Sequence, residues 1–280
     1  MHNRRRRVRG VMSTTFRVVG AIALIAVILW AGAARAETYR FGVPPFMPTD
    51  QLVRTYQPLV DYLAQATGHN IILAPAASFP LHWQRLQTDF WDLQFNPAHL
   101  TDYILRFHNH RLVVKHQGQL SFTLVTSDRQ PAMEPEDLTG QPVAVPAPPS
   151  MGSVQLELLY PDPVHYPHVV EVAHAIEAIA RVRSGTVVGA YIPSPLVAGF
   201  PQLHTVHTTD PFPHFGLTAS DRVPPEVVSR ISHALLTANA TAAGQQMLHA
   251  SALVGFETAE RSIYASYYRW LKSMWGYRGD

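Results

Sequence analysis

Two α/β units in series, preceded by an export signal, are the architecture that this sequence predicts. Three observations indicate it. Basic residues and an apolar run occupy the first 36 residues, strand and helix patterns alternate twice along the remaining 244 (280 minus 36), and extended segments separate the two alternating regions. The chain has no cysteine, so disulfide bonds, thiol chemistry and cysteine-based metal sites are excluded.

The first 36 residues have the layout of a signal peptide. An apolar run over 18–30 is shorter than the ~20 residues of a membrane span, and Ala34-Arg35-Ala36 is a small-x-small cleavage site. We therefore predict cleavage after Ala36 and a periplasmic location, with an uncleaved N-terminal anchor as the alternative. A lipoprotein anchor is excluded because no cysteine follows the run. The basic region ahead of the run consists of Arg4, Arg5, Arg6, Arg7 and Arg9.

Removal of the leader reverses the sign of the net charge. Seven arginines lie in residues 1–36, so Lys+Arg falls from 22 to 15 while Asp+Glu stays at 20, and the net charge changes from +2 to −5. The basic pI of the full chain, about 8.9, therefore gives no support to nucleic-acid binding.

The first alternating region predicts a parallel sheet covered on both faces. Apolar residues at helical spacing, Leu52, Tyr56 and Leu59, predict a helix that ends at Gly68. Pro97 suits the first turn of a helix that continues to Phe107. In chain order we expect strands over 38–43, 71–76 and 91–95, a helix after the first strand, and further helices over 81–88 and 97–107.

Two extended runs, 111–116 and 119–127, come next, with a turn at Gln117-Gly118. The alternation then resumes. We expect strands over 143–145, 169–172, 187–192, 203–208 and 215–219, and helices over 150–160 and 174–182. Three helices are expected at the end of the chain, over 226–239, 244–250 and 258–275.

The most informative segment is the loop before the helix predicted over 150–160. Small residues and prolines over 146–153 lead from a buried strand into the first turn of that helix. Backbone N–H groups at a helix N-terminus lack intrahelical acceptors, so such a loop suits an anion or a polar ligand. The alternative for Ser150 is that its hydroxyl only caps the helix.

An ordered set of motifs resembles the phosphate/phosphite/phosphonate class of periplasmic solute-binding proteins, which serve ABC transporters. The motifs span nearly the whole chain after residue 36: Phe41-Gly42-Val43-Pro44-Pro45, Trp91-Asp92-Leu93-Gln94-Phe95-Asn96-Pro97, Asp137-Leu138-Thr139-Gly140-Gln141-Pro142-Val143, Ser184-Gly185-Thr186-Val187 and Val223-Pro224-Pro225-Glu226. The resemblance implies an α/β, two-lobed type II periplasmic-binding-protein fold with two crossing strands at the hinge. It places lobe one at 37–125 plus 210–280 and lobe two at 126–209.

The resemblance also implies the function. A small phosphate- or phosphonate-like oxyanion would bind in the cleft between the lobes, the lobes would close on it, and a membrane permease would recognise the closed form. We expect a monomer, no cofactor and no enzymatic activity. The sequence departs from the family at three places: Met151 replaces a hydroxyl residue of the anion loop, Pro193 replaces an acidic residue, and Asn96 replaces a glycine.

The candidate ligand-binding residues lie in the loops at the strand ends, where open α/β sheets bind ligands. For His174 and His99 a capping or helix-surface role is the alternative, and for the aromatic candidates a place in the core. Lys115, Arg85 and Arg129 are possible sources of positive charge for an anion. The complete candidate set is Ser150, Met151, Gly152, Ser153, His174, Asn96, His99, Phe46, Ser78, Tyr191 and Ser194.

Three other functions stay open at this point. Fourteen histidines follow the leader and include three close pairs, which makes metal capture conceivable: His108 with His110, His165 with His168, and His204 with His207. A ligand sensor on the same fold is a second alternative. An enzyme is the weakest, because the chain has no Gly-x-Ser-x-Gly, phosphate-binding loop or dinucleotide-binding motif.

Overall fold

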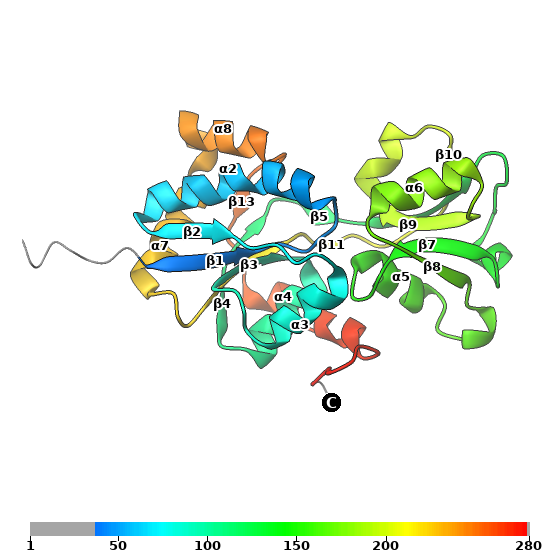
Figure 1. Ribbon diagram of the computed structural model, residues 1–280, viewed down its shortest axis with the longest axis horizontal. Helices are drawn as coiled ribbons and strands as arrows, with labels where there is room; N and C mark the ends of the chain where they lie inside the picture. The colour runs from blue at the N-terminus through cyan, green and yellow to red at the C-terminus, as the bar shows by residue number, and fades with distance from the viewer. Residues whose placement is uncertain (1–36, 279–280) are drawn as a thin grey trace, which may run out of the picture. The chain divides into compact units, whose positions relative to one another are not determined.

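The computed structural model describes residues 37–278, so the predicted signal peptide and its cleavage site lie outside the described residues. From Thr38 onward the chain forms one unit that contains two main β-sheets (Figure 1). Within the described part, none of the helices combines the length and the apolar character that a membrane crossing requires.

The first sheet has six strands in the order β13-β4-β12-β3-β1-β2. Helix α2 covers one face, and α3 and α4 cover the other (Figure 1). The strands are β1 (Thr38–Gly42), β2 (Asn70–Leu73), β3 (Leu93–Asn96), β4 (His110–His116), β12 (Gly216–Ser220) and β13 (Phe256–Glu257). The helices are α2 (Thr49–Thr67), α3 (Phe79–Gln87), α4 (Ala98–Phe107), α7 (Pro225–Leu236) and α8 (Ala242–Ala250).

The second sheet has five strands in the order β10-β6-β9-β7-β8. Helix α6 lies on one face and α5 on the other (Figure 1). The strands are β6 (Phe122–Ser127), β7 (Pro142–Pro146), β8 (His168–Val172), β9 (Gly189–Pro193) and β10 (Leu203–Thr208), and the helices are α5 (Met151–Leu159) and α6 (Ala175–Ser184).

Two segments cross from one sheet to the other. The chain leaves the first sheet after β4 and enters the second at β6, and it returns from β10 to β12. On the way, β5 (Gln119–Leu120) pairs antiparallel with β11 (Phe212–Pro213), which ties the two crossings together. The two runs around the Gln117-Gly118 turn therefore belong to different sheets. The lobe boundary expected between residues 125 and 126 falls inside β6, because the whole of that strand pairs within the second sheet.

Local sequence explains where the helices begin and end. Helix α2 buries its apolar stripe and stops at Gly68, whose positive φ of 74° is a conformation that glycine adopts without a steric penalty. Helix α6 begins at His174, whose ring nitrogen Nδ1 accepts a hydrogen bond from the Glu177 backbone N–H at 3.2 Å. The first helix therefore ends at the predicted residue, and α6 lies where the sequence predicts a helix over 174–182 but continues to Ser184.

The sheets are mixed rather than parallel. Strand β1 pairs parallel with β2 and β3, and β7 with β8 and β9, as predicted. Strand β12 instead runs antiparallel to β3 and β4, and β6 runs antiparallel to β9 and β10. The antiparallel strands are those next to the crossings. The apolar composition of these strands indicates that they are buried. It does not indicate whether they run parallel or antiparallel to their neighbours.

The predicted helix over 258–275 is wrong. Two short 3-10 turns, η5 (Arg261–Tyr264) and η6 (Tyr267–Leu271), occupy this range. Ser266, between them, has a φ of 81°, which interrupts any continuous helix. The segment is held instead by tertiary contacts to α4, including a hydrogen bond from the Tyr268 N–H to Asp102 Oδ2 at 2.9 Å.

Candidate functional site

The first turn of α5 follows directly from the end of β7, at the edge of the second sheet. Ser150 is the N-cap: its Oγ accepts from the Ser153 backbone N–H at 3.1 Å and donates to the Pro146 carbonyl at 2.7 Å. The Ser153 hydroxyl donates to the Ser150 carbonyl at 2.9 Å. Both predicted hydroxyls are therefore engaged within the loop, as the capping alternative expects.

Two backbone donors in this turn have no acceptor. Among the residues that the structure describes, the N–H groups of Met151 and Gly152 make no hydrogen bond, because the residues four positions before them lie outside the helix. They are positive ends of peptide dipoles at the helix N-terminus, where an anion is stabilised. The turn can therefore bind an oxyanion through its backbone.

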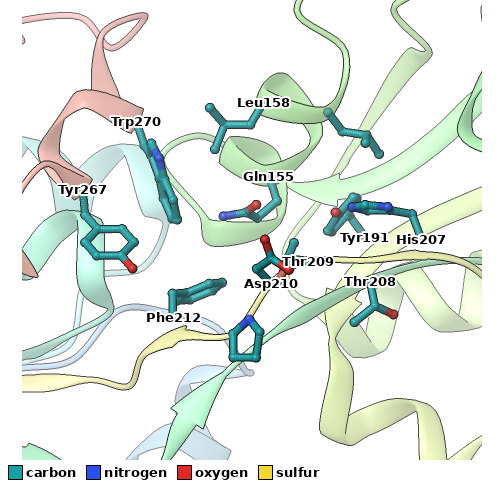
Figure 2. Close-up of a pocket in the computed structure, with 12 residues that line it drawn as sticks. Gln155, Leu158, Tyr191, His207, Thr208, Thr209, Asp210, Phe212, Tyr267 and Trp270 are labelled. Carbon is teal, nitrogen blue, oxygen red and sulfur yellow. The ribbon is translucent and has the colours of Figure 1, made fainter. Parts of the chain in front are cut away.

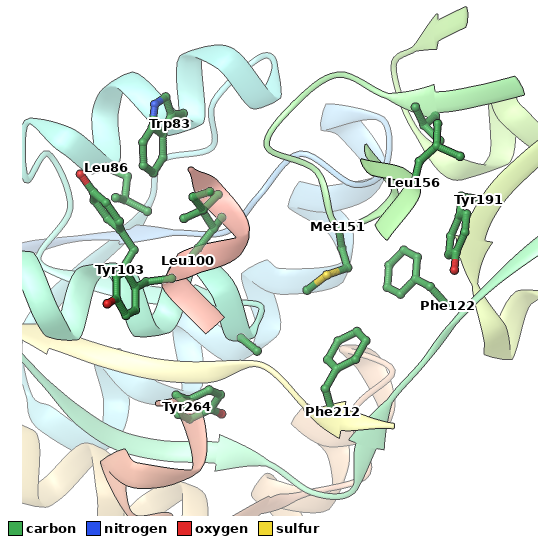
Figure 3. Packing of buried hydrophobic residues seen from close by; sticks show 14 of the residues in the cluster. Trp83, Leu86, Leu100, Tyr103, Phe122, Met151, Leu156, Tyr191, Phe212 and Tyr264 are labelled. Atoms are coloured by element: carbon green, nitrogen blue, oxygen red, sulfur yellow. The ribbon is translucent and has the colours of Figure 1, made fainter. Parts of the chain in front are cut away.

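Close packing fixes the position of the turn. A Cβ atom added to Gly152 would lie 2.9 Å from the Tyr191 carbonyl oxygen, so only glycine lets α5 approach β9 this closely. Met151 is 5% exposed and belongs to an apolar cluster that includes Leu100 of α4, which covers the first sheet, and Tyr191 of β9 in the second sheet. Figure 3 shows its thioether extending from the start of α5 towards side chains of the first sheet's helices.

His99 joins the two sheets at this point. Its Nε2 lies 2.9 Å from the Pro149 carbonyl, which can only accept, so Nε2 carries the proton and Nδ1 is an unprotonated atom. Nδ1 is buried and has no partner among the described residues. Burial lowers the pKa of His99 to about 4, so the ring is neutral near pH 7. The predicted residue His99 therefore meets the predicted loop, through the carbonyl next to Ser150.

Asn96 lies in a buried polar network under α3. Its Nδ2 donates to Gln94 Oε1 at 2.9 Å, and its Oδ1 accepts from His82 Nε2 at 3.0 Å. Burial lowers the pKa of His82 to about 3, so this ring is also neutral. Both polar atoms of the Asn96 amide are used within the network.

The remaining predicted residues have local structural roles. Ser78 accepts from the Leu81 N–H at 3.3 Å and caps α3, as His174 caps α6. Phe46 packs edge-on against Tyr56 and Phe215 with ring centroids 6.0 and 5.8 Å away. The Ser194 hydroxyl is 2.8 Å from the hydroxyls of both Ser121 and Thr123 beside the crossing segments.

The basic residues expected near an anion are engaged elsewhere or exposed. The Lys115 ammonium donates to the carbonyls of His116 and Gly118 at 3.0 Å and pairs with Glu257. Arg85 donates to the Pro75 carbonyl at 3.0 Å, and Arg129 is exposed. Within residues 37–278 no three His, Asp or Glu side chains are arranged to hold a metal ion. Because these basic side chains are engaged elsewhere or exposed, an anion at the first turn of α5 would be bound by backbone N–H groups.

Comparison with known proteins decides the family. A family model described as "ABC transporter, phosphonate, periplasmic substrate-binding protein" matches residues 41–264, which is more than half of the chain. The chain belongs to this family. Membership makes it a transport component of the periplasm with a small-molecule ligand and a membrane permease as partner, in a family that is not one of enzymes. No curated protein sequence matches it significantly.

Solved structures show the same two-lobed fold for this phosphonate-family protein. PhnD1 from Prochlorococcus marinus (MIT 9301), in complex with methylphosphonate, has a TM-score of 0.74 and 12% identity, over 85% of this chain and 98% of that one. A binding protein component of an ABC phosphonate transporter from Pseudomonas aeruginosa has a TM-score of 0.71 and 14% identity, over 82% and 83%. A Xanthomonas citri protein bound to ATP has a TM-score of 0.70 and 13% identity, over 85% and 99%.

Sequence reasoning missed a pocket in this phosphonate-family protein. A hollow of about 350 Å³ lies between α5, β9, the end of β10 and the turn η6 (Figure 2). Only Tyr191 among its lining residues is a predicted site residue. The available sequence signal was weak: Tyr267 and Trp270 are three residues apart, a spacing that also suits an ordinary packed helix.

Proposed function

We propose that this protein is exported to the periplasm, binds a small alkylphosphonate and delivers it to its ABC permease. The phosphonate oxygens would accept hydrogen bonds from the first turn of α5. The observation that carries this proposal is the pair of free N–H groups at Met151 and Gly152, next to the contact between His99 and Pro149 that joins the two sheets.

The surroundings of the turn favour an alkyl group over a second charge. Met151 presents an apolar side chain where the family places a hydroxyl, and it lies in a cluster of apolar residues from the helices of the first sheet and from the second sheet. Pro193 stands where the resemblance expects an acidic partner for an ammonium group. An alkylphosphonate therefore suits this turn better than an aminoalkylphosphonate or inorganic phosphate. The complex of the similar Prochlorococcus protein with methylphosphonate agrees with this choice.

Binding would favour closure of the two lobes about the paired crossings β5 and β11. Lobe one would hold the six-stranded sheet and lobe two the five-stranded sheet. The protein would act as a monomer after removal of residues 1–36. A ligand that contacts both lobes stabilises the closed form by the difference between its affinities for the two forms.

The test is calorimetric titration of protein purified from the periplasm with methylphosphonate, ethylphosphonate, 2-aminoethylphosphonate, phosphate and sulfate. We expect the two alkylphosphonates to bind most tightly. Met151→Pro should weaken this binding about tenfold, because it deletes one N–H donor to a charged acceptor. Proline is favoured at this first helical position, and the extended conformation of Ser150, with φ −59° and ψ 152°, permits a following proline.

Met151→Ala is the matched control, because it removes the thioether and keeps the N–H. Both variants lose the same side-chain packing, so their difference reports the donor alone. Equal affinities of the two variants for methylphosphonate would place the oxyanion elsewhere. Absence of binding by every phosphonate would reject the proposed ligand class.

A further inference from the structure

The missed pocket has a wall of three aromatic side chains. Trp270 lies against Tyr267 with ring centroids 4.7 Å apart at 84°, and against Phe212 with centroids 5.6 Å apart at 89°. Phe212 is 4% exposed and belongs to β11, so the wall is anchored on the paired crossing segments. These mutual edge contacts hold the rings in place before any ligand arrives.

Asp210 faces this wall with an unpaired carboxylate. In the part of the chain that the structure describes, its side chain makes no hydrogen bond or ion pair, and no lysine or arginine lines the pocket. Figure 2 shows the carboxylate next to the Gln155 amide, with Phe212, Tyr267 and Trp270 to one side of both groups. A carboxylate and the faces of aromatic rings both attract positive charge, so the pocket favours a cation over an anion.

The remaining lining groups are apolar side chains and uncharged polar groups that can both accept and donate hydrogen bonds, together with the imidazole of His207. Leu158 and Leu159 supply apolar surface, and the Gln155 amide and the Thr209 hydroxyl can accept hydrogen bonds. An inorganic cation such as Ca²⁺ needs six or more oxygen ligands and usually several carboxylates, whereas this pocket offers a single carboxylate beside a few neutral oxygens. An organic cation uses the apolar walls and the single charge together.

We propose that the Asp210 pocket is a binding site for a small organic ammonium ion. The ammonium group would lie between the Asp210 carboxylate and the rings of Phe212, Tyr267 and Trp270. The site is separate from the proposed phosphonate donors at Met151 and Gly152, since it uses Gln155 and the residues beyond it on α5. The proposal therefore stands whether or not the protein binds phosphonates.

The test is calorimetric titration of periplasmic protein with choline chloride, ethylammonium chloride and potassium chloride, with intrinsic tryptophan fluorescence, compared between the parent and Trp270→Leu, as a second readout. We expect saturable binding of choline and no binding of potassium. Asp210→Asn should weaken choline binding about tenfold or more, through loss of the charge pair. Asp128→Asn is the matched control, because Asp128 is also exposed, lacks a side-chain partner and lies at the far end of β6.

Trp270→Leu should weaken choline binding more than it weakens ethylammonium binding, because the methylated cation depends on the ring faces. Thermal melting of each variant without ligand establishes that it is folded. Unchanged choline affinity in folded Asp210→Asn, equal binding of potassium and choline, or no binding of either organic cation would overturn the proposal. Methylphosphonate titration of Asp210→Asn keeps the two sites distinguishable, since that affinity should not change.

Discussion

Gly152 is the residue at which packing and the candidate site meet. Its hydrogen atoms are all that fit between α5 and the Tyr191 carbonyl, where a Cβ would lie at 2.9 Å. The same residue supplies one of the two free N–H groups. Its type is thus required by the approach of a helix to a strand, and its backbone donor follows from its place in the first turn.

We therefore expect Gly152→Ala to lower the free energy of unfolding by about 1–3 kcal/mol, because α5 must move away from β9. Phosphonate affinity should fall as well, since the turn moves with the helix. Denaturant unfolding measures the first effect and calorimetry the second. The matched control is Gly199→Ala, where an added Cβ meets nothing within 4 Å. A similar effect at both glycines would contradict the packing argument.

At the scale of single elements, the junction of β3 and α4 carries a buried neutral imidazole. His99 keeps its pKa at about 4 in the native state, below the ordinary value of 6.5. Between these pH values the unfolded chain binds a proton that the native ring does not. The contribution of the neutral His99 ring to the free energy of unfolding is therefore fully present above about pH 6.5. It is lost as the pH falls towards 4. Burial shifts the pKa of His82 and His214 in the same direction, to about 3.

We expect the melting temperature to fall between pH 7 and pH 4.5, and His99→Gln to reduce that fall. The proton linkage of His99 is worth about 2–3 kcal/mol over this range, and a glutamine amide can still donate to the Pro149 carbonyl. Since carboxylates also titrate, the readout is the difference between variant and parent at the two pH values. His249→Gln, on an exposed position of α8, should leave the fall unchanged. An equal fall in His99→Gln would show that His99 is not its source.

The elements also show what sequence could predict. Apolar periodicity and capping residues located α2, α5 and α6, because those signals are local. Strand direction at β6 and β12 depends on which sheet the chain joins after each crossing, and no local pattern encodes that. The prediction of a helix over 258–275 failed because the aromatic residues of this segment pack against α4 and do not form one face of a helix. Ser266, in a left-handed conformation, also interrupts the segment.

The site was predictable only in part, for the same reason. The loop before α5 carries its own sequence signal, and His99 was found because it follows a strand end. The bonds of Ser150 are local and follow the capping alternative, whereas the bond between Asn96 and His82 depends on the packing of α3 against β3. The Asp210 pocket combines four separate stretches of chain, from α5 to η6, so its aromatic wall does not exist before folding.

At the scale of the whole molecule, two crossings carry every covalent connection between the sheets. They are held together by the β5–β11 pair and by the rings of His116 and His214, whose centroids are 3.9 Å apart. Burial lowers the pKa of both rings, so the pair, whose planes are tilted by 37°, is neutral at pH 7. A neutral pair avoids the repulsion that two imidazolium ions beside Lys115 would create at the connection.

At the same scale, the sequence of residues 1–36 predicts that the protein is exported and that this leader is removed. If residues 1–36 are removed, the protein loses seven positive charges and no negative ones, and periplasmic material should begin at Glu37. Intact-mass spectrometry of protein from the periplasmic fraction measures the start directly. Replacing both small residues of the cleavage site, Ala34→Leu with Ala36→Leu, should leave the leader attached and the protein in the membrane fraction. Ala33→Leu, outside the small-x-small pair, is the control and should be processed. A full-length soluble protein would mean that the leader is not cleaved.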